Sequence, residues 1–175
     1  MKKTNEYKSP IAALFWSVTM IGFGQIYNGQ YIFGAFLVLF EISTNGLSSL
    51  NTSIVHSFHG DHQLAHDVFN HQWGLFYPSV YGFSMWQAYN KAIVINCQRE
   101  KKDYPKETYL TGFFILFVMG MNLGVYYHDC FLNGNHFFSF LSSPIFNGLC
   151  WGIIFGFAGH LAEKYIKSKR KKFKE

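Results

Sequence analysis

Long apolar stretches alternate with short polar ones along the whole chain. A helix that crosses a membrane needs roughly 20 mostly apolar residues, and five stretches approach that length. The pattern predicts five spans, at about 11–27, 31–50, 73–95, 109–127 and 137–162. The expected fold is therefore an all-α helical bundle within a membrane, formed by residues 1–175 as one domain.

Basic residues are confined to three short regions at the edges of the apolar stretches. No Lys or Arg lies between Lys8 and Lys91, and none lies between Lys106 and Lys164. Charged residues make up 14% of the chain, against about 25% in soluble proteins, which supports membrane insertion. A nucleic-acid-binding protein would carry its basic residues on one folded face, so the expected partner is the anionic inner leaflet of a bilayer.

The orientation follows from the rule that cytoplasmic loops are rich in Lys and Arg. The basic tail at 163–175 and the basic segment at 99–106 are expected in the cytoplasm, and 51–72, which has no Lys or Arg, outside. Five full crossings then place the basic N-terminus outside, against the rule, although later charges can override a weak N-terminal signal. The alternative is that residues 11–27 lie in the interface or form a re-entrant element.

The first two apolar stretches are joined by a short uncharged segment, which predicts a tight helical hairpin. Its characteristic residues are Gly22, Gly24, Gln25, Asn28, Gly29 and Gln30. Glycine permits positive φ and close backbone approach, and hydrocarbon offers no hydrogen bonds to a turn. The amides either satisfy the backbone groups of the joint, or line a polar passage or bind a lipid headgroup.

The same region resembles a known family. One motif is Ser9-Pro10-x-Ala12-Ala13-Leu14 followed by Gly22-Phe-Gly24-Gln25-Ile-Tyr27-Asn28-Gly29-Gln30, and a second runs from Trp86 to Ala92, with Asn96 beyond it. Together they are similar to small bacterial membrane proteins with a glycine-rich hairpin, related to the two-helix domain named TM-two. The resemblance covers about residues 9–97 and implies membrane architecture rather than an activity. Ile21 and Gln87 depart from it, because the family usually has Pro and Asp there.

One acidic residue lies deep within a predicted span. Glu41 is ten residues beyond Tyr31, which is about 15 Å along a helix. A carboxylate at that depth faces a partner or a water-filled cavity, unless the span ends near it. A functional carboxylate would bind a cation, relay a proton or contact a substrate. A structural one would be protonated and bonded to nearby hydroxyls, or would pair with the third span through Lys91, Asn90 or Gln87.

Histidines are concentrated in the predicted outer segment, 51–72, which contains His56, His59, His62, His66 and His71. On one helix, the spacing of His59, His62 and His66 places their side chains on a shared face, where imidazoles can bind zinc or copper. His128 and His136 are expected on the same side of the membrane. Two other interpretations stay open: an amphipathic surface helix that uses His as a mild polar residue, and a pH sensor.

The sequence contains no recognised catalytic arrangement. His128-Asp129-Cys130 are sequence neighbours, whereas catalytic groups converge in space, and no phosphate-binding loop or dinucleotide motif occurs. We therefore expect a non-enzymatic accessory, assembly or sensing protein of a bacterial plasma membrane, associated with another membrane protein or with copies of itself. The alternatives are a transporter or channel component that uses Glu41, and a membrane-embedded enzyme. No cofactor is expected beyond a metal ion at the histidines.

Overall fold

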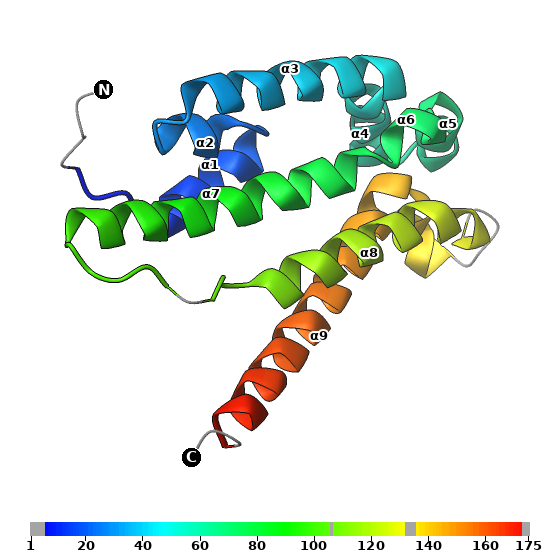
Figure 1. Cartoon of the computed structure of the whole chain (residues 1–175). Helices are drawn as coiled ribbons and strands as arrows, with labels where there is room; N and C mark the ends of the chain where they lie inside the picture. The colour runs from blue at the N-terminus through cyan, green and yellow to red at the C-terminus, as the bar shows by residue number, and fades with distance from the viewer. Residues whose placement is uncertain (1–5, 106, 132–135, 173–175) are drawn as a thin grey trace. The chain divides into compact units, whose positions relative to one another are not determined.

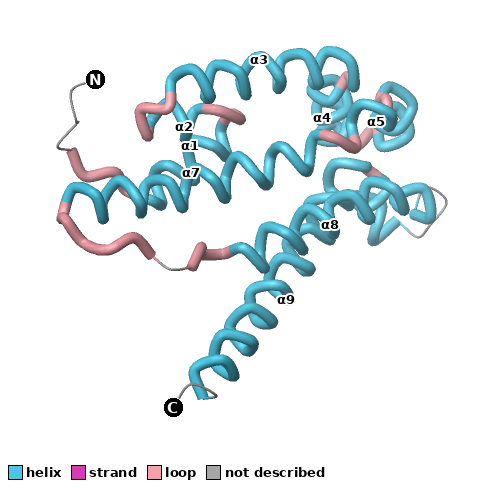
Figure 2. The backbone as a smooth tube through the Cα atoms, in the orientation of Figure 1, coloured by secondary structure: helices cyan, strands magenta, loops and turns pink. Residues whose placement is uncertain are grey.

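The computed structural model describes residues 6–105, 107–131 and 136–172, and within these ranges the chain forms helices and turns without strands (Figures 1 and 2). This confirms the all-α prediction. The elements in order are α1 (Pro10–Thr19), α2 (Phe23–Tyr27), α3 (Tyr31–Ser48), α4 (Leu50–His59), α5 (His62–Val68), α6 (His71–Gly74), α7 (Tyr77–Arg99), α8 (Thr111–Tyr127), the 3-10 helices η1 (His128–Phe131) and η2 (His136–Ser142), and α9 (Pro144–Lys172).

Three stretches of helix are long and apolar enough to cross a membrane. They are Tyr31–Ser48, Thr111–Phe131 and Pro144–Arg170, which correspond to the second, fourth and fifth predicted spans. The third predicted span corresponds to α7, which has 23 residues but a more polar composition. The basic tail continues α9 to Lys172; residues 173–175, like Lys2 and Lys3, lie outside the described part.

The first predicted span is not one helix. The chain leaves α1 at Met20, which has extended backbone angles, and enters α2 at Gly22, whose φ of +97° belongs to the left-handed region. A residue with a side chain rarely adopts that angle, so Gly22 permits the break. Before it, Pro10 begins α1 and the Ser9 hydroxyl accepts a hydrogen bond from the Ala12 N–H, as in a standard helix N-terminus.

The chain divides into two compact units. Unit 1 comprises Met1–Ile42 and Val80–Tyr109, and unit 2 comprises Ser43–Ser79 and Leu110–Glu175. In unit 1, small residues allow α1, α2 and α7 to approach closely: Ala13, Ala88 and Ala92 form its buried apolar cluster. The expectation of a single membrane domain stays a prediction.

In unit 2, α8 and α9 lie side by side as a hairpin (Figure 1). Glycines allow their backbones to meet: a Cβ added at Gly120 would collide with the Trp151 carbonyl, and one at Gly124 with the Asn147 carbonyl. Such close contact is how helices associate in lipid, where apolar burial gives no driving force.

The histidine-rich segment of unit 2 packs against this hairpin. Leu50, Phe69 and Val125 form a buried cluster that joins the segment to α8. At its other side, the hydroxyl oxygens of Ser57 and Ser143 lie 2.6 Å apart, and both side chains are buried. These contacts fix the segment against the ends of α8 and α9.

Candidate metal centre

Three imidazoles from three different elements converge in unit 2. His66 lies on α5, His71 begins α6 and His128 begins η1, and one ring nitrogen from each lies within 4.8 Å of the other two. The ring centroids are 4.9 Å apart for His66 and His128, 5.5 Å for His71 and His128, and 5.6 Å for His66 and His71.

The fold brings these rings together through their neighbours in the sequence. Phe69 and Val125 belong to one buried cluster, and His71 and His128 follow them by two and three residues. Asn70 fixes the turn between Phe69 and His71: its N–H donates to the Ser48 carbonyl at 2.9 Å and its side chain accepts from the Gln72 N–H. The apolar contact therefore determines the position of two of the three imidazoles.

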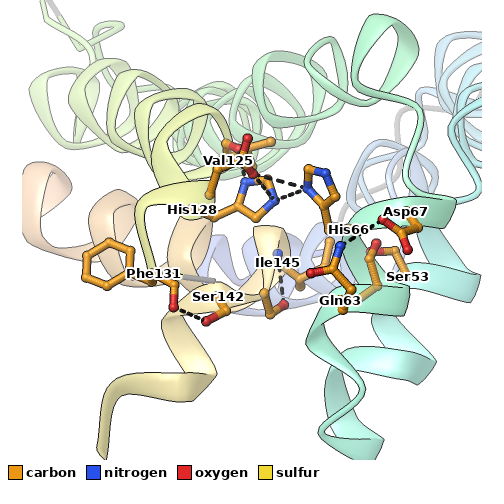
Figure 3. A network of polar contacts seen from close by, with 12 residues as sticks. Ser53, Gln63, His66, Asp67, Val125, His128, Phe131, Ser142 and Ile145 are labelled. Atoms are coloured by element: carbon orange, nitrogen blue, oxygen red, sulfur yellow. Dashed lines mark hydrogen bonds and ion pairs between the residues drawn. The ribbon is translucent and has the colours of Figure 1, made fainter. Parts of the chain in front are cut away.

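A backbone contact sets the protonation of His128. Its Nδ1 lies 2.6 Å from the Val125 carbonyl oxygen, and a carbonyl can only accept, so Nδ1 carries the hydrogen. In the neutral ring, Nε2 is then left with a lone pair, and it points at His66 Nδ1, 2.8 Å away (Figure 3). This tautomer is the one that metal-binding histidines adopt when the other nitrogen donates to a backbone carbonyl.

Asp129 adds a carboxylate to the same place. Its Oδ1 lies 3.1 Å from His66 Nδ1 and 3.0 Å from His128 Nε2. With neutral rings, a hydrogen on His66 Nδ1 can satisfy that nitrogen's contacts, but His128 Nε2 and the carboxylate then face each other as two acceptors. A cation between the three atoms attracts all of them. Ligands arranged tetrahedrally at 2.0–2.2 Å from zinc would lie about 3.3 Å from one another, close to the separations among His66, His128 and Asp129. Asp129 is not part of the group in which the nitrogen of His71 also lies within 4.8 Å of the others.

His71 is held in the form that binds metal. Burial lowers the pKa of His71 from its ordinary value of 6.5, and the neighbouring His66 lowers it further. Asp129 and a hydrogen bond with the Phe69 backbone oppose that shift, without reversing it. His71 is therefore neutral at pH 7, with a lone pair available.

The predicted set of ligands, His59, His62 and His66, is only partly brought together. The prediction assumed one helix, which is wrong: Gly60, with φ of +83°, ends α4 after His59, and α5 begins at His62. His59 and His62 are therefore outside the group that contains His66. His62 Nδ1 is buried without a hydrogen-bond partner among the described residues. The side chain of His136 lies outside the described residues.

Sequence reasoning missed His71 and His128 as partners of His66. His128 was placed on the same side of the membrane, but its 62-residue separation from His66 hid the contact. The available signal was that His71 lies two residues before the third predicted span and His128 directly follows the fourth.

Glu41, the predicted intramembrane carboxylate, accepts a hydrogen bond in unit 1. Its Oε2 lies 2.6 Å from the Ile21 nitrogen, in the break between α1 and α2. This contact favours the structural interpretation, with a backbone N–H as a partner that the sequence did not indicate. Lys91 lies on α7 and is half-buried, and its pairing with Glu41 stays a prediction.

The amides of the predicted hairpin bind α7. The buried Gln25 donates to the Ser84 carbonyl at 2.9 Å and to the Gln87 side chain at 2.8 Å. Gln87 donates in turn to Gln30 at 3.1 Å, and Asn28 donates to the Ala88 carbonyl at 2.8 Å. Gly22 and Gly29 have positive φ, whereas at Gly24 a side chain would collide with α1. These bonds favour the structural interpretation of the amides, although Asn28 Oδ1 is buried without a hydrogen-bond partner among the described residues.

Comparison of the chain with protein-family models, with curated proteins and with solved structures gave no match. The resemblance of residues 9–97 to the TM-two family therefore stays a prediction, and the function is argued from the site alone.

Proposed function

We propose that this chain is a non-enzymatic integral membrane protein of a bacterial plasma membrane that binds one zinc or copper ion outside the membrane, as a sensing or accessory protein. The observation that carries the proposal is the convergence of His66, His71 and His128 from three separate elements. The similarity of residues 9–97 to TM-two proteins supports the membrane architecture and does not bear on the metal.

The ligand set indicates the class of metal. Three imidazoles and one carboxylate suit zinc, copper or nickel, whereas magnesium and calcium prefer oxygen ligands alone. With Asp129 as the fourth ligand, the protein would complete a tetrahedral site, and catalytic zinc sites instead keep one position open for water or substrate. This supports binding rather than catalysis.

The arrangement also gives metal binding a structural effect. His66 and His71 lie in the histidine-rich segment, whereas His128 and Asp129 follow α8, so one ion would join parts of the chain about 60 residues apart. Metal binding stabilises the arrangement that holds its ligands. A partner protein that binds the stabilised arrangement at the outer surface would then respond to the metal.

The test is a titration of the full-length protein, purified in detergent without a polyhistidine tag. We expect one zinc or copper ion per chain by equilibrium dialysis, with at least a tenfold loss of affinity in His66→Ala and in His71→Ala. His59→Ala and His160→Ala are matched controls, because neither histidine belongs to the group, and both should bind as the natural sequence does. Circular dichroism confirms that each variant is folded.

Two results would contradict the proposal. One is the absence of zinc and copper binding at micromolar concentrations in folded protein. The other is a folded His71→Ala variant that binds as tightly as the His59→Ala control, because the ion would then be held elsewhere.

A further inference from the structure

We infer that α1 and α2 form a re-entrant hairpin, which enters the membrane from the cytoplasmic face and returns to the same face without crossing it. The chain then crosses four times, through α3, α7, α8 and α9, and both ends lie in the cytoplasm. This goes beyond the proposed function and replaces the favoured prediction of five crossings.

The two ends of the hairpin contact each other. The Ser9 N–H, immediately before α1, donates to the Tyr27 hydroxyl at the end of α2, at 3.1 Å. The Lys8 ammonium lies 5.1 Å from the centre of the Tyr27 ring. The Tyr27 side chain therefore reaches back to the start of α1, which favours a chain that does not cross the membrane between these residues.

Two independent counts give the depth of the tip. α1 has 10 residues, which is about 15 Å of helix, or half of a hydrocarbon core of about 30 Å. Glu41 lies ten residues into α3, again about 15 Å, and it accepts the Ile21 N–H at the tip. The backbone of the tip is shallower than these counts, because Gly22 lies against Gly34 and Val38, three and seven residues into α3, or about 5–11 Å along it. The tip therefore enters the hydrocarbon without reaching the opposite face.

The tip has the hydrogen bonds that this depth requires. Backbone outside regular helix is tolerated there only where it is buried in protein. The Gly22 N–H donates to the Ser84 hydroxyl at 3.3 Å, and the Tyr81 hydroxyl donates to the Val18 carbonyl at 2.9 Å. Both partners belong to α7, and Gln87 of the same helix also bonds the hairpin, so these three polar residues of α7 face the hairpin.

A contact with α7 assigns the side of the membrane. Asn96 accepts from the Lys8 N–H at 2.9 Å and donates to the Lys8 carbonyl at 2.7 Å. The Arg99 guanidinium lies 5.9 Å from the Tyr7 ring centre. The N-terminus therefore lies beside the basic end of α7, which the distribution of Lys and Arg places in the cytoplasm. With four crossings, the basic residues outside the spans are all expected on that side, and the conflict at the N-terminus is removed.

The test is cysteine labelling of right-side-out and inverted membrane vesicles with an impermeant maleimide. In a background with Cys97, Cys130 and Cys150 changed to serine, single cysteines replace Glu6, the outer control Asp61 and the inner control Asp103. All three positions are exposed. We expect the Glu6→Cys variant to react like Asp103→Cys, at least tenfold faster in inverted vesicles. If the Glu6→Cys variant instead reacted faster in right-side-out vesicles, as Asp61→Cys should, the inference would be overturned.

A second measurement distinguishes a re-entrant hairpin from a helix that lies flat at the inner surface. A nitroxide attached at Val18→Cys, near the tip, should show the collision ratio for oxygen and a nickel chelate of a label at Ile42→Cys. If the label at Val18→Cys instead showed the collision ratio of a label at Tyr31→Cys, at the membrane surface, the inference would be overturned. Neither measurement needs the metal, so the topology and the proposed function can each fail independently.

Discussion

Replacing Glu41 tests whether its carboxylate serves as an acceptor for the backbone or as a charge. Glu41→Leu removes the acceptor of the Ile21 N–H, whereas Glu41→Gln removes the charge and keeps an acceptor oxygen. A hydrogen bond to a charged group contributes about 1.5–3 kcal/mol, and a buried donor without a partner costs about 1–3 kcal/mol. We therefore expect Glu41→Leu to lose about 2–4 kcal/mol, and Glu41→Gln about 1 kcal/mol or less.

The measurement is thermal unfolding of the purified protein in detergent. For a chain of 150–250 residues, 1 kcal/mol corresponds to about 2–4 °C in Tm, so Glu41→Leu should unfold about 4–16 °C below the natural sequence. Both variants should still insert in the membrane. Equal Tm values for Glu41→Leu and the natural sequence would refute the structural role. A transporter would instead be supported if the natural sequence carried a cation flux in liposomes and an equally stable Glu41→Gln variant lost that flux.

Three further predictions concern packing and pH. Ser84→Ala removes a buried hydroxyl that accepts from Gly22 and donates to Gln25, and it should cost about 1–3 kcal/mol in thermal unfolding. The exposed Ser79→Ala on the same helix should change stability by less than about 0.5 kcal/mol, and equal losses would contradict the network. Gly120→Ala should destabilise by about 1–3 kcal/mol, because the new Cβ meets the Trp151 carbonyl. Gly46 faces open space on α3, so Gly46→Ala should be neutral or stabilising by about 0.5–1 kcal/mol. If Gly46→Ala and Gly120→Ala both destabilised the protein, the contact with Trp151 would not be the cause. The pKa of His71 is lowered in the folded chain from its ordinary value of 6.5. Below about pH 6.5, the unfolded chain therefore binds more protons than the folded chain. The Tm of protein in EDTA should therefore be constant above about pH 6.5 and fall below it, less steeply in His71→Gln, and parallel slopes would contradict that assignment.

The helical class was predictable because lipid imposes long apolar segments. The second and fourth predicted spans agree with α3 and α8 to within two residues at each end. The fifth differs more, because α9 begins seven residues later, at Pro144, and continues ten residues beyond the predicted end, to Lys172. The division of the first span was harder to predict, because Met20 and Ile21 are as apolar as a helix interior. Only the glycine at 22 indicated a break, and its effect depends on Glu41 and Ser84, which come later in the sequence.

The candidate site was predictable in its chemistry and not in its membership. The excess of histidine outside the spans indicated a metal or proton site, and His66 was among the predicted ligands. The other two members depend on the contact between Phe69 and Val125, which are 56 residues apart. Helical spacing describes only neighbours along one element, so it could not select His71 or His128 over His59 and His62.

The double contact between Lys8 and Asn96 has a consequence for synthesis of the protein. The first helices leave the ribosome long before α7, whose residues satisfy their polar groups, and 88 positions separate the two contacting residues. At about 5–20 residues per second, this delay is about 4–18 s. Gly22 and Gln25 bond Ser84 and Gln87, which follow them by 59–62 residues, so these polar groups lack their partners for about 3–12 s. During that time the N-terminal segment needs water, at the membrane surface or within the insertion machinery. Insertion of the N-terminal segment would therefore follow that of α3, in reverse of the order in which they are made.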